Sequence, residues 1–452
     1  MEQKREKFGS RFAVIAAMAG SAVGLGNIWR FPYILGEYGG AAFILVYIAA
    51  TLVLGLPILY AESIIGRRSR SDTFGAMKKL APGTPWRWAG LLTIISPILI
   101  LSYYSVVGGW SVEYLFKSLS FDFMDMPASE IPDFFGRFIS SPYQPILTHT
   151  VFMAAVVAVV LGGVSKGIEK FSKLAMPALF LLILVIAVYS LTLPGAFAGV
   201  EYLLKPDFSR LTAGACAAAL GQAFFSLSLG VGAILTYASY VKKEEDLHIS
   251  GVGTAVSDLI FALIAAFAVI PSVFAAGLKP TDGPSLLFET LPYIFNKMGE
   301  GVPLVSSVIS VFFFVTILAA ALTSAISMLE VGVAFLADEK GFKRRNATLL
   351  LGFLCWLVGV LCSLSFGPLS GVKILGATFF FFLDHLCSDW LMPAGGLVFT
   401  LFVGWRLSKA QVRDELTNGG RCNKVGYRIF YFLIRYVAPI GIVAVFFTNL
   451  LL

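Results

Sequence analysis

The chain has 452 residues, of which 58% are hydrophobic and 13% are charged, and its formal net charge is +7. Soluble domains contain about 25% charged residues, so this composition excludes a string of soluble domains. It predicts one integral membrane domain over residues 1–452. The five cysteines and three histidines are scattered, without the spacing of a C-x-x-C motif or a metal site.

Eleven apolar segments follow one another along the chain. Each is long enough for a bilayer crossing, which takes about 20 mostly apolar residues. They lie at about 11–36, 41–66, 88–117, 146–164, 171–193, 214–241, 247–277, 303–337, 346–366, 377–406 and 427–451. We therefore expect an all-α, polytopic membrane protein with eleven transmembrane helices.

The basic residues concentrate in alternate connections, for example at Arg67, Arg68 and Arg70, and at Lys343, Arg344 and Arg345. Cytoplasmic loops carry an excess of Lys and Arg, so we expect these loops and the N-terminus to face the cytoplasm. The expected location is the cell membrane, the inner membrane of a prokaryote. The bilayer then accounts for the positive charge without a nucleic-acid partner.

The first segment and the sixth are both interrupted by glycine. Gly20, Gly24 and Gly26 lie in the middle of the first segment, and Gly230 and Gly232 in the sixth. Each glycine costs a helix about 1 kcal/mol. Matched interruptions in two halves of a chain are typical of a transporter's midplane site, although glycines alone also serve helix packing. We expect helices 1 and 6 to be discontinuous, with freed carbonyls for cations and freed N–H groups for a carboxylate.

Four ionisable residues lie within the apolar segments, where a charge costs about 2.5–3.5 kcal/mol. Glu62 is interpreted as a cap for N–H groups of a broken helix, or as an interfacial carboxylate. Asp258 is interpreted as the partner of a bound cation, or as a protonated or water-facing acid. Arg30 either gates a pathway or extends to the interface, and Glu330 belongs to a polar network near the cytoplasm.

The eighth segment places Ala320, Thr323 and Ser324 on one helical face. Their oxygens suit a sodium ion, although hydroxyls in helices also bond to their own backbone. Three sequence motifs, at residues 5–40, 221–240 and 322–330, are similar to those of a known family. The similarity covers nearly the whole chain. The chain resembles the neurotransmitter:sodium symporters, in particular short prokaryotic amino-acid transporters such as the bacterial leucine and tyrosine transporters.

The resemblance implies a LeuT-like fold, a 5+5 inverted repeat. Repeat one covers about 11–193, repeat two about 214–406, and an extra helix about 427–451. It also implies sodium-coupled symport into the cell by alternating access, with two Na⁺ ions, a small amino acid and the lipid bilayer as partners and no enzymatic activity. The oligomeric state is not given by the sequence.

The resemblance also supplies expected site residues. The first sodium site, Na1, matches Ala22, Asn27, Ser226 and Asp258, and the second, Na2, matches Gly20, Val23, Ala320, Thr323 and Ser324. The substrate site matches Ser21, Ala22, Gly24, Leu25, Gly26, Ile100, Tyr104, Phe225, Ser226, Ser228, Val231, Ser324 and Met328. Tyr104 is expected to bind the substrate carboxylate and Phe225 to close the pocket.

The expected gates depart from the family pattern in two places. Arg5 and Asp338 match the inner gate pair, with Tyr240 nearby, but Phe8 replaces the usual tryptophan. Arg30 matches the outer gate cation. Its usual aspartate aligns with Phe381, and the nearest acid is Asp384.

Three positions predict the transported solute. Gly24 stands where monoamine carriers have an aspartate, which favours a substrate that brings its own carboxylate. Val231 replaces a bulkier aromatic residue, which favours a hydrophobic or aromatic L-amino acid. Asp258 supplies a fixed negative charge that predicts chloride independence.

Three other functions fit parts of the pattern. One is a sodium-driven carrier of another small zwitterion on the same fold. An ion channel would need rings of polar residues around a pore. An intramembrane enzyme would need a nucleophile and base or a metal, and the sequence shows neither constellation.

Overall fold

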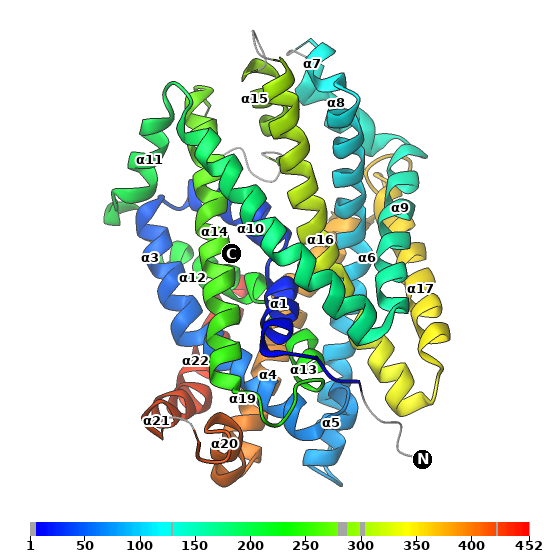
Figure 1. The fold of residues 1–452 in the computed structure, drawn as a ribbon, viewed down its shortest axis with the longest axis vertical. Coiled ribbons are helices and arrows are strands. Elements are labelled where there is room, and N and C mark those ends of the chain that lie inside the picture. The colour runs from blue at the N-terminus through cyan, green and yellow to red at the C-terminus, as the bar shows by residue number, and fades with distance from the viewer. Residues whose placement is uncertain (1–5, 128–129, 279–286, 299–302, 422–423, 452) are drawn as a thin grey trace.

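A computed structural model describes residues 6–127, 130–278, 287–298, 303–421 and 424–451 (Figure 1). Within these residues, nine helices are long and apolar enough to cross a bilayer, and a further crossing consists of two helices that meet at a 53° bend. The short apolar helix α12 (Ala213–Ser226) and α13 (Ala233–Ala238) make the remaining crossing. The described chain therefore contains the expected eleven spans, and spans one and six are the discontinuous ones.

The first five spans contain the following elements, including π-helical turns marked η. They are α1 (Arg11–Ala22), η1 (Gly26–Arg30) and α2 (Phe31–Glu37); α3 (Ala41–Ala50), η2 (Thr51–Gly55) and α4 (Leu56–Ser69); α6 (Trp86–Leu119); α9 (Gln144–Leu161); and η4 (Val164–Glu169) with α10 (Lys170–Leu191). Short helices connect them: α5 (Thr73–Leu80), α7 (Asp122–Asp125) and α8 (Ile131–Ser140).

The later spans follow α11 (Ala196–Leu204) and η5 (Phe208–Arg210). After α12 and α13 come α14 (Leu247–Ala275); α16 (Pro303–Lys340); α17 (Arg344–Leu364); α18 (Phe379–His385), η7 (Leu386–Leu391), α19 (Met392–Leu401) and η8 (Phe402–Arg406); and α21 (Lys424–Phe432), η9 (Leu433–Val437) and α22 (Ala438–Leu451). The connections include α15 (Thr290–Met298), α20 (Lys409–Leu416) and an antiparallel pair, β1 (Lys373–Ile374) and β2 (Ala377–Thr378).

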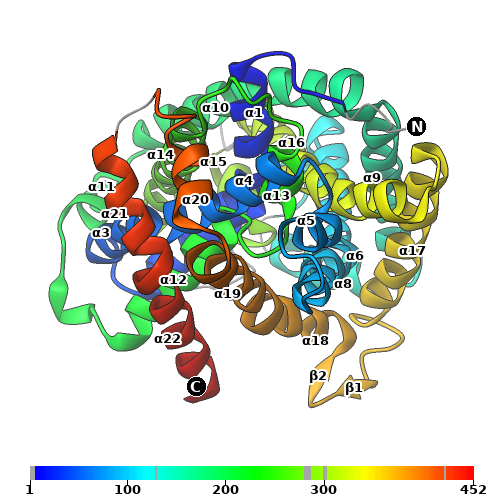
Figure 2. The same cartoon turned by 90° about the horizontal axis from the view of Figure 1, so that it is seen from below.

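The spans divide into a buried centre and a lipid-facing periphery. The most apolar stretch of α6 is 72% buried, whereas the corresponding stretches of α9 and α17 are 39% buried. Figure 2 shows α4, α13 and α16 near the middle, with α17 and α22 at the edges. Peripheral side chains such as Leu174 and Ile440 are exposed. Exposed apolar residues on this scale are expected where the solvent is hydrocarbon.

The fifth span begins earlier than its apolar run indicates. We expected about 171–193, but η4 begins at Val164. The carboxylate of Glu6 accepts hydrogen bonds from the backbone N–H groups of Val164 at 2.8 Å and Ser165 at 3.1 Å. A carboxylate at a helix N-terminus accepts hydrogen bonds from backbone N–H groups that have no acceptor within the helix. This contact, made across the fold, extends the helix into a polar stretch.

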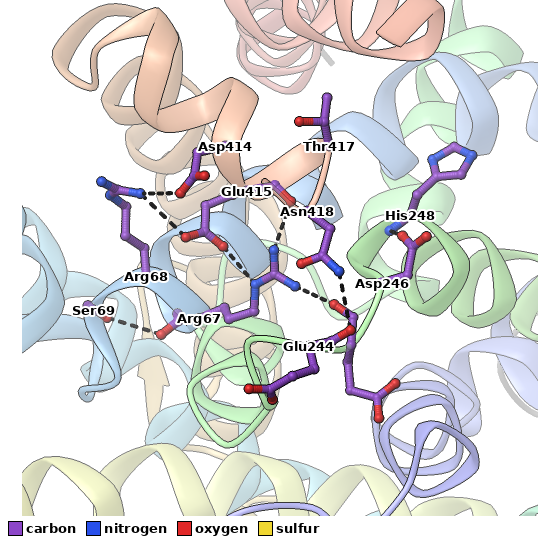
Figure 3. Close-up of polar contacts among 12 residues, drawn as sticks. Arg67, Arg68, Ser69, Glu244, Asp246, His248, Asp414, Glu415, Thr417 and Asn418 are labelled. Atoms are coloured by element: carbon purple, nitrogen blue, oxygen red, sulfur yellow. Dashed lines mark hydrogen bonds and ion pairs between the residues drawn. The ribbon is translucent and has the colours of Figure 1, made fainter. Parts of the chain in front are cut away.

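A buried ion pair joins three segments beside the lower end of α4 (Figure 3). The Nε atom of Arg67 lies 2.7 Å from Oε2 of Glu415 on α20. The Arg67 guanidinium also donates to the backbone carbonyls of Glu415 at 2.8 Å and Glu245 at 2.5 Å. The two paired side chains are only 2% and 6% exposed. Arg67 thus fixes the end of α4 against α20 and the connection between spans six and seven.

Candidate functional site

The first break lies between α1 and η1. Helix α1 ends at Ala22, and Val23 has an extended ψ of 105°. The carbonyl of Ser21 accepts hydroxyl hydrogen bonds from Ser228 at 2.7 Å and Ser324 at 3.1 Å. The carbonyl of Val23 accepts longer ones, both at 3.4 Å, from Thr323 and Ser324. The freed carbonyls therefore point at hydroxyl oxygens from spans six and eight.

The second break lies between α12 and α13. Ser228, Gly230 and Gly232 have positive φ values of 51°, 81° and 68°, a backbone geometry that suits glycine. The carboxylate of Glu62 accepts hydrogen bonds from the N–H groups of Gly230 at 2.8 Å and Leu235 at 3.4 Å. The interpretation of Glu62 as a cap for a broken helix is confirmed.

The side chains expected at Na1 form one buried cluster. Asn27 Nδ2 donates to Ser226 Oγ at 2.9 Å and to Asp258 Oδ1 at 2.7 Å. The Ser226 hydroxyl lies 2.8 Å from Asp258 Oδ2, and the fourth expected residue, Ala22, is the last residue of α1. Asp258 is fully buried, and the ion pairs among the described residues do not include it. A buried carboxylate without a fixed cation favours a mobile one.

Tyr47 belongs to the same cluster and was missed by the sequence analysis. Its hydroxyl lies 3.1 Å from Ser226 Oγ and 3.4 Å from Asp258 Oδ2, and the side chain is fully buried. The available signal was a tyrosine within an apolar run, because a buried Tyr hydroxyl requires a partner. The sequence did not indicate which partner.

The residues expected at Na2 also lie together. Thr323 Oγ1 is 2.9 Å from the Ala320 carbonyl of its own helix and 3.4 Å from the Val23 carbonyl across the break. A Cβ atom on Gly20 would lie 3.3 Å from Thr323 Cβ, so α1 and α16 are in close contact there. Both interpretations of these hydroxyl groups hold for Thr323. Its hydroxyl bonds to the backbone of its own helix and also to a carbonyl of the first break.

A cavity of about 30 Å³ lies between the two breaks. All the expected substrate residues line it except Ser21 and Ser226, and Met392 lines it as well. The Ser21 hydroxyl bonds to Ser327 at 2.8 Å instead, and Ser226 faces the Asp258 cluster. A Cβ atom on Gly24 would lie 2.5 Å from Ser324 Oγ, so a larger residue at position 24 would collide with this wall of the cavity.

Tyr104 and Phe225 both line this cavity. The Tyr104 hydroxyl accepts a hydrogen bond from the backbone N–H of Leu25 at 3.3 Å. The Phe225 ring packs on Gly26, where an added Cβ would lie 2.8 Å from ring atom Cδ1. The Arg30 guanidinium lies 4.9 Å from the centre of the Phe225 ring.

The expected outer gate is not a direct ion pair. Arg30 donates to Gln222 at 3.5 Å, and Asp384 accepts from Ser388 at 3.2 Å. Among the described residues, the ion pairs within 4.0 Å do not join Arg30 to Asp384. The two gate candidates therefore have separate hydrogen-bond partners, Gln222 and Ser388.

Of the described inner gate residues, Asp338 is exposed, whereas Tyr240 is buried and belongs to a polar network. Arg5 is outside the described residues, while Asp338 accepts the backbone N–H of Asp72 at 3.1 Å. Tyr240 donates to Glu330 at 2.7 Å, and Arg344 donates to the same carboxylate at 2.9 Å. The interpretation of Glu330 as a network member is confirmed. Phe8 is buried and packs edge-on against Tyr237 and Tyr240.

Comparison with known proteins identifies the family. The family model described as "Sodium:neurotransmitter symporter family" matches residues 5–127 and 139–452. The chain belongs to this family. The symporter is 40% identical to the sodium-dependent transporter YhdH of Bacillus subtilis, over 98% of each chain, and 32% identical to a sodium-dependent transporter of Haemophilus influenzae, over 99% of each.

A solved structure extends the comparison to the fold. The crystal structure of MhsT in complex with L-phenylalanine matches this symporter with a TM-score of 0.90 and 42% identity, over 98% of this chain and 99% of that one. The symporter therefore has the expected LeuT-like fold of two inverted five-helix repeats. It is a multi-pass membrane protein and a sodium-dependent transporter, not an enzyme.

Proposed function

We propose that the chain imports a hydrophobic or aromatic L-amino acid together with Na⁺ by alternating access. The observation that carries this proposal is the cavity between the two breaks, which joins apolar walls to polar backbone. Leu25, Ile100 and Val231 supply the apolar walls. Polar groups of the breaks and Tyr104 lie at the same cavity, where an amino acid's charged ends have partners.

The absence of a side chain at Gly24 favours a zwitterion. A monoamine needs a carboxylate from the protein, whereas an amino acid brings its own. Tyr104 is proposed to donate to that carboxylate, because its hydroxyl hydrogen is not used in the contact with Leu25. The amino acid bound in the MhsT crystal structure is L-phenylalanine, which supports an aromatic substrate here.

Two Na⁺ ions are proposed as co-substrates. One would bind Ala22, Asn27, Ser226 and Asp258, and the other Gly20, Val23, Ala320, Thr323 and Ser324. Each ion moving down a 100 mV potential releases about 2.3 kcal/mol, and a tenfold gradient adds about 1.4 kcal/mol. Two ions supply roughly 7 kcal/mol, enough for about 10⁵-fold accumulation.

Transport is proposed to be independent of chloride. The Asp258 carboxylate is buried beside Tyr47 and Ser226, so a fixed negative charge already balances a sodium ion there. The substrate carboxylate would complete Na1. Binding of ion and substrate would then be reciprocal, each raising the affinity for the other.

The proposed orientation follows the basic loops. The N-terminus would lie in the cytoplasm and the chain in the cell membrane, because the positively charged connections favour the inner side. The proposed repeat bounds are about 11–193 and 214–406, with the last span about 427–451 outside both repeats.

Uptake by purified protein in proteoliposomes tests the proposal. An inward Na⁺ gradient is imposed, and radiolabelled leucine, phenylalanine, tryptophan, glycine and alanine are compared with and without chloride. We expect sodium-dependent, saturable uptake of the hydrophobic amino acids in gluconate as well as chloride. Uptake restricted to glycine or alanine would contradict the substrate class. A strict chloride requirement would contradict the role of Asp258, and an unsaturable current would favour a channel.

A further inference from the structure

Two cavities meet at the same pair of side chains. The larger one has a volume of about 240 Å³ and is lined by residues of η1, α2, α12, η7, α19 and α22, including Arg30 and Val445. The smaller one is the cavity of about 30 Å³ between the breaks. Of the residues described as lining them, Phe225 and Met392 line both. These two side chains form the partition between the cavities.

The backbone at Met392 is closely packed. A Cβ atom on Gly230 would lie 2.0 Å from the Met392 carbonyl oxygen, and one on Gly395 would lie 1.9 Å from the Gly230 carbonyl oxygen. Span ten is thus in direct backbone contact with the second break. Pro393 in the first turn of α19 restricts the chain further. Only the side chain of Met392 is left to adjust.

The smaller cavity does not hold an amino-acid side chain as it stands. Its volume corresponds to about two water molecules, so part of the wall has to move for a substrate to bind. Leu25, Ile100 and Val231 are at most 3% exposed, and neither they nor Met328 are among the residues that line the larger cavity. The Phe225 ring is held between Gly26 and Arg30.

Met392 differs from these residues in what lies behind it. On its far side is the cavity of about 240 Å³, which is large enough to receive the thioether. Methionine is unbranched and has three rotatable bonds, so it changes shape at little cost. The movable part of the wall is therefore on span ten and not on the two broken spans.

We propose that Met392 determines the largest substrate side chain that the carrier accepts. It forms the partition together with Phe225, and a bulky side chain displaces its thioether into the larger cavity. A small side chain leaves the thioether in place and is held by contact with it. This role rests on the proposed transport of hydrophobic amino acids.

The test compares the inhibition of sodium-dependent leucine uptake by unlabelled leucine and by tryptophan in proteoliposomes. Met392→Ala is expected to shift the affinity ratio about tenfold towards tryptophan, because it removes the displaced group. Met392→Ile is expected to shift the ratio about tenfold towards leucine, because a β-branched side chain has few rotamers. Met392→Leu, which conserves volume, tests whether substitution at this position is tolerated.

Val445→Ala is the matched control, because Val445 lines the larger cavity but not the smaller one. Its affinity ratio is expected to stay within about twofold of the wild type. If the wild type transports both amino acids and neither Met392→Ala nor Met392→Ile shifts the ratio, the role of Met392 is overturned and the proposed function stands. If the wild type transports neither amino acid, the proposed function is overturned and the role of Met392 with it.

Discussion

In the first break the freed carbonyls of Ser21 and Val23 accept hydrogen bonds from hydroxyl groups, whereas in the second break the freed N–H groups of Gly230 and Leu235 share one carboxylate, that of Glu62. A hydroxyl can rotate and present its oxygen instead of its hydrogen. The carboxylate cannot move away without leaving the buried N–H groups with no acceptor. The first break is therefore suited to exchange partners, and the second to keep its own.

This difference would let the proposed site combine a mobile ion with a fixed frame. Sodium prefers hard oxygen ligands, such as the carbonyls of the first break and the hydroxyls of Thr323 and Ser324. The second break is held from α4, whose lower end is in turn held by Arg67. Four substitutions test the two breaks separately. They are given in order of expected effect, the largest first.

Arg67→Gln tests the support of the second break from the inner side. Removing one partner of a buried ion pair costs about 3–5 kcal/mol, and Glu415 would keep only its longer contact of 3.4 Å with the partly exposed Arg68. We expect the midpoint of thermal unfolding in detergent to fall by about 5–10 °C. The exposed ion pair of Lys205 with Glu201, at 3.2 Å, offers a control. Lys205→Gln should change the midpoint by less than about 2 °C. Equal shifts would show that the buried position of Arg67 is irrelevant.

Glu62→Ala tests the second break itself. It leaves the N–H groups of Gly230 and Leu235 without an acceptor, at about 1–3 kcal/mol each. We expect sodium-dependent substrate affinity to fall by about 100-fold or more. Glu62→Gln keeps one acceptor oxygen and should lose less. Near-normal affinity in the alanine variant would mean that the second break does not need its carboxylate.

Asp258→Asn tests the cluster that adjoins the first break. Hydrogen bonds to a charged group contribute about 1.5–3 kcal/mol, so we expect the sodium concentration for half-maximal uptake to rise about 10–100-fold. Because the fixed charge is lost, chloride should now stimulate uptake. The measurement is sodium titration in chloride and in gluconate. An unchanged sodium response would exclude Asp258 from ion binding.

Ser324→Ala tests the exchangeable hydroxyls and should have the smallest effect. One hydroxyl contributes about 1 kcal/mol, which corresponds to about a fivefold loss in sodium affinity. Ser310→Ala is the control. Ser310 is also on α16, but its buried hydroxyl bonds to Ser118 and not to a residue of either break. If both variants lose affinity equally, the effect comes from packing of α16 and not from the break.

Much of the fold was predictable because the bilayer imposes a simple rule. Apolar runs identified the spans, and glycines identified the two interrupted ones. The start of the fifth span was predicted too late, since the acceptor that caps it comes from Glu6, 158 residues away in sequence. The composition of one segment does not reveal a helix cap that another segment supplies.

The site residues divide in the same way. Gly24, Asn27 and Ser324 were predicted because they stand in long motifs that resemble a known family, and the structure places them at the breaks. Tyr47 and Met392 were missed, since each is an ordinary residue within an apolar span. Neither has a local signal that distinguishes a residue of a cavity wall or of a buried polar cluster from a residue of a packed core.

By itself the sequence determined where the chain crosses a bilayer and where two crossings lose their helical winding, because hydropathy and glycine content act locally. The tertiary structure alone decided that Glu62 holds one break, that hydroxyls of span eight face the other, and that Met392 lines two cavities. These facts depend on which helical faces meet, and that is set by packing between segments hundreds of residues apart.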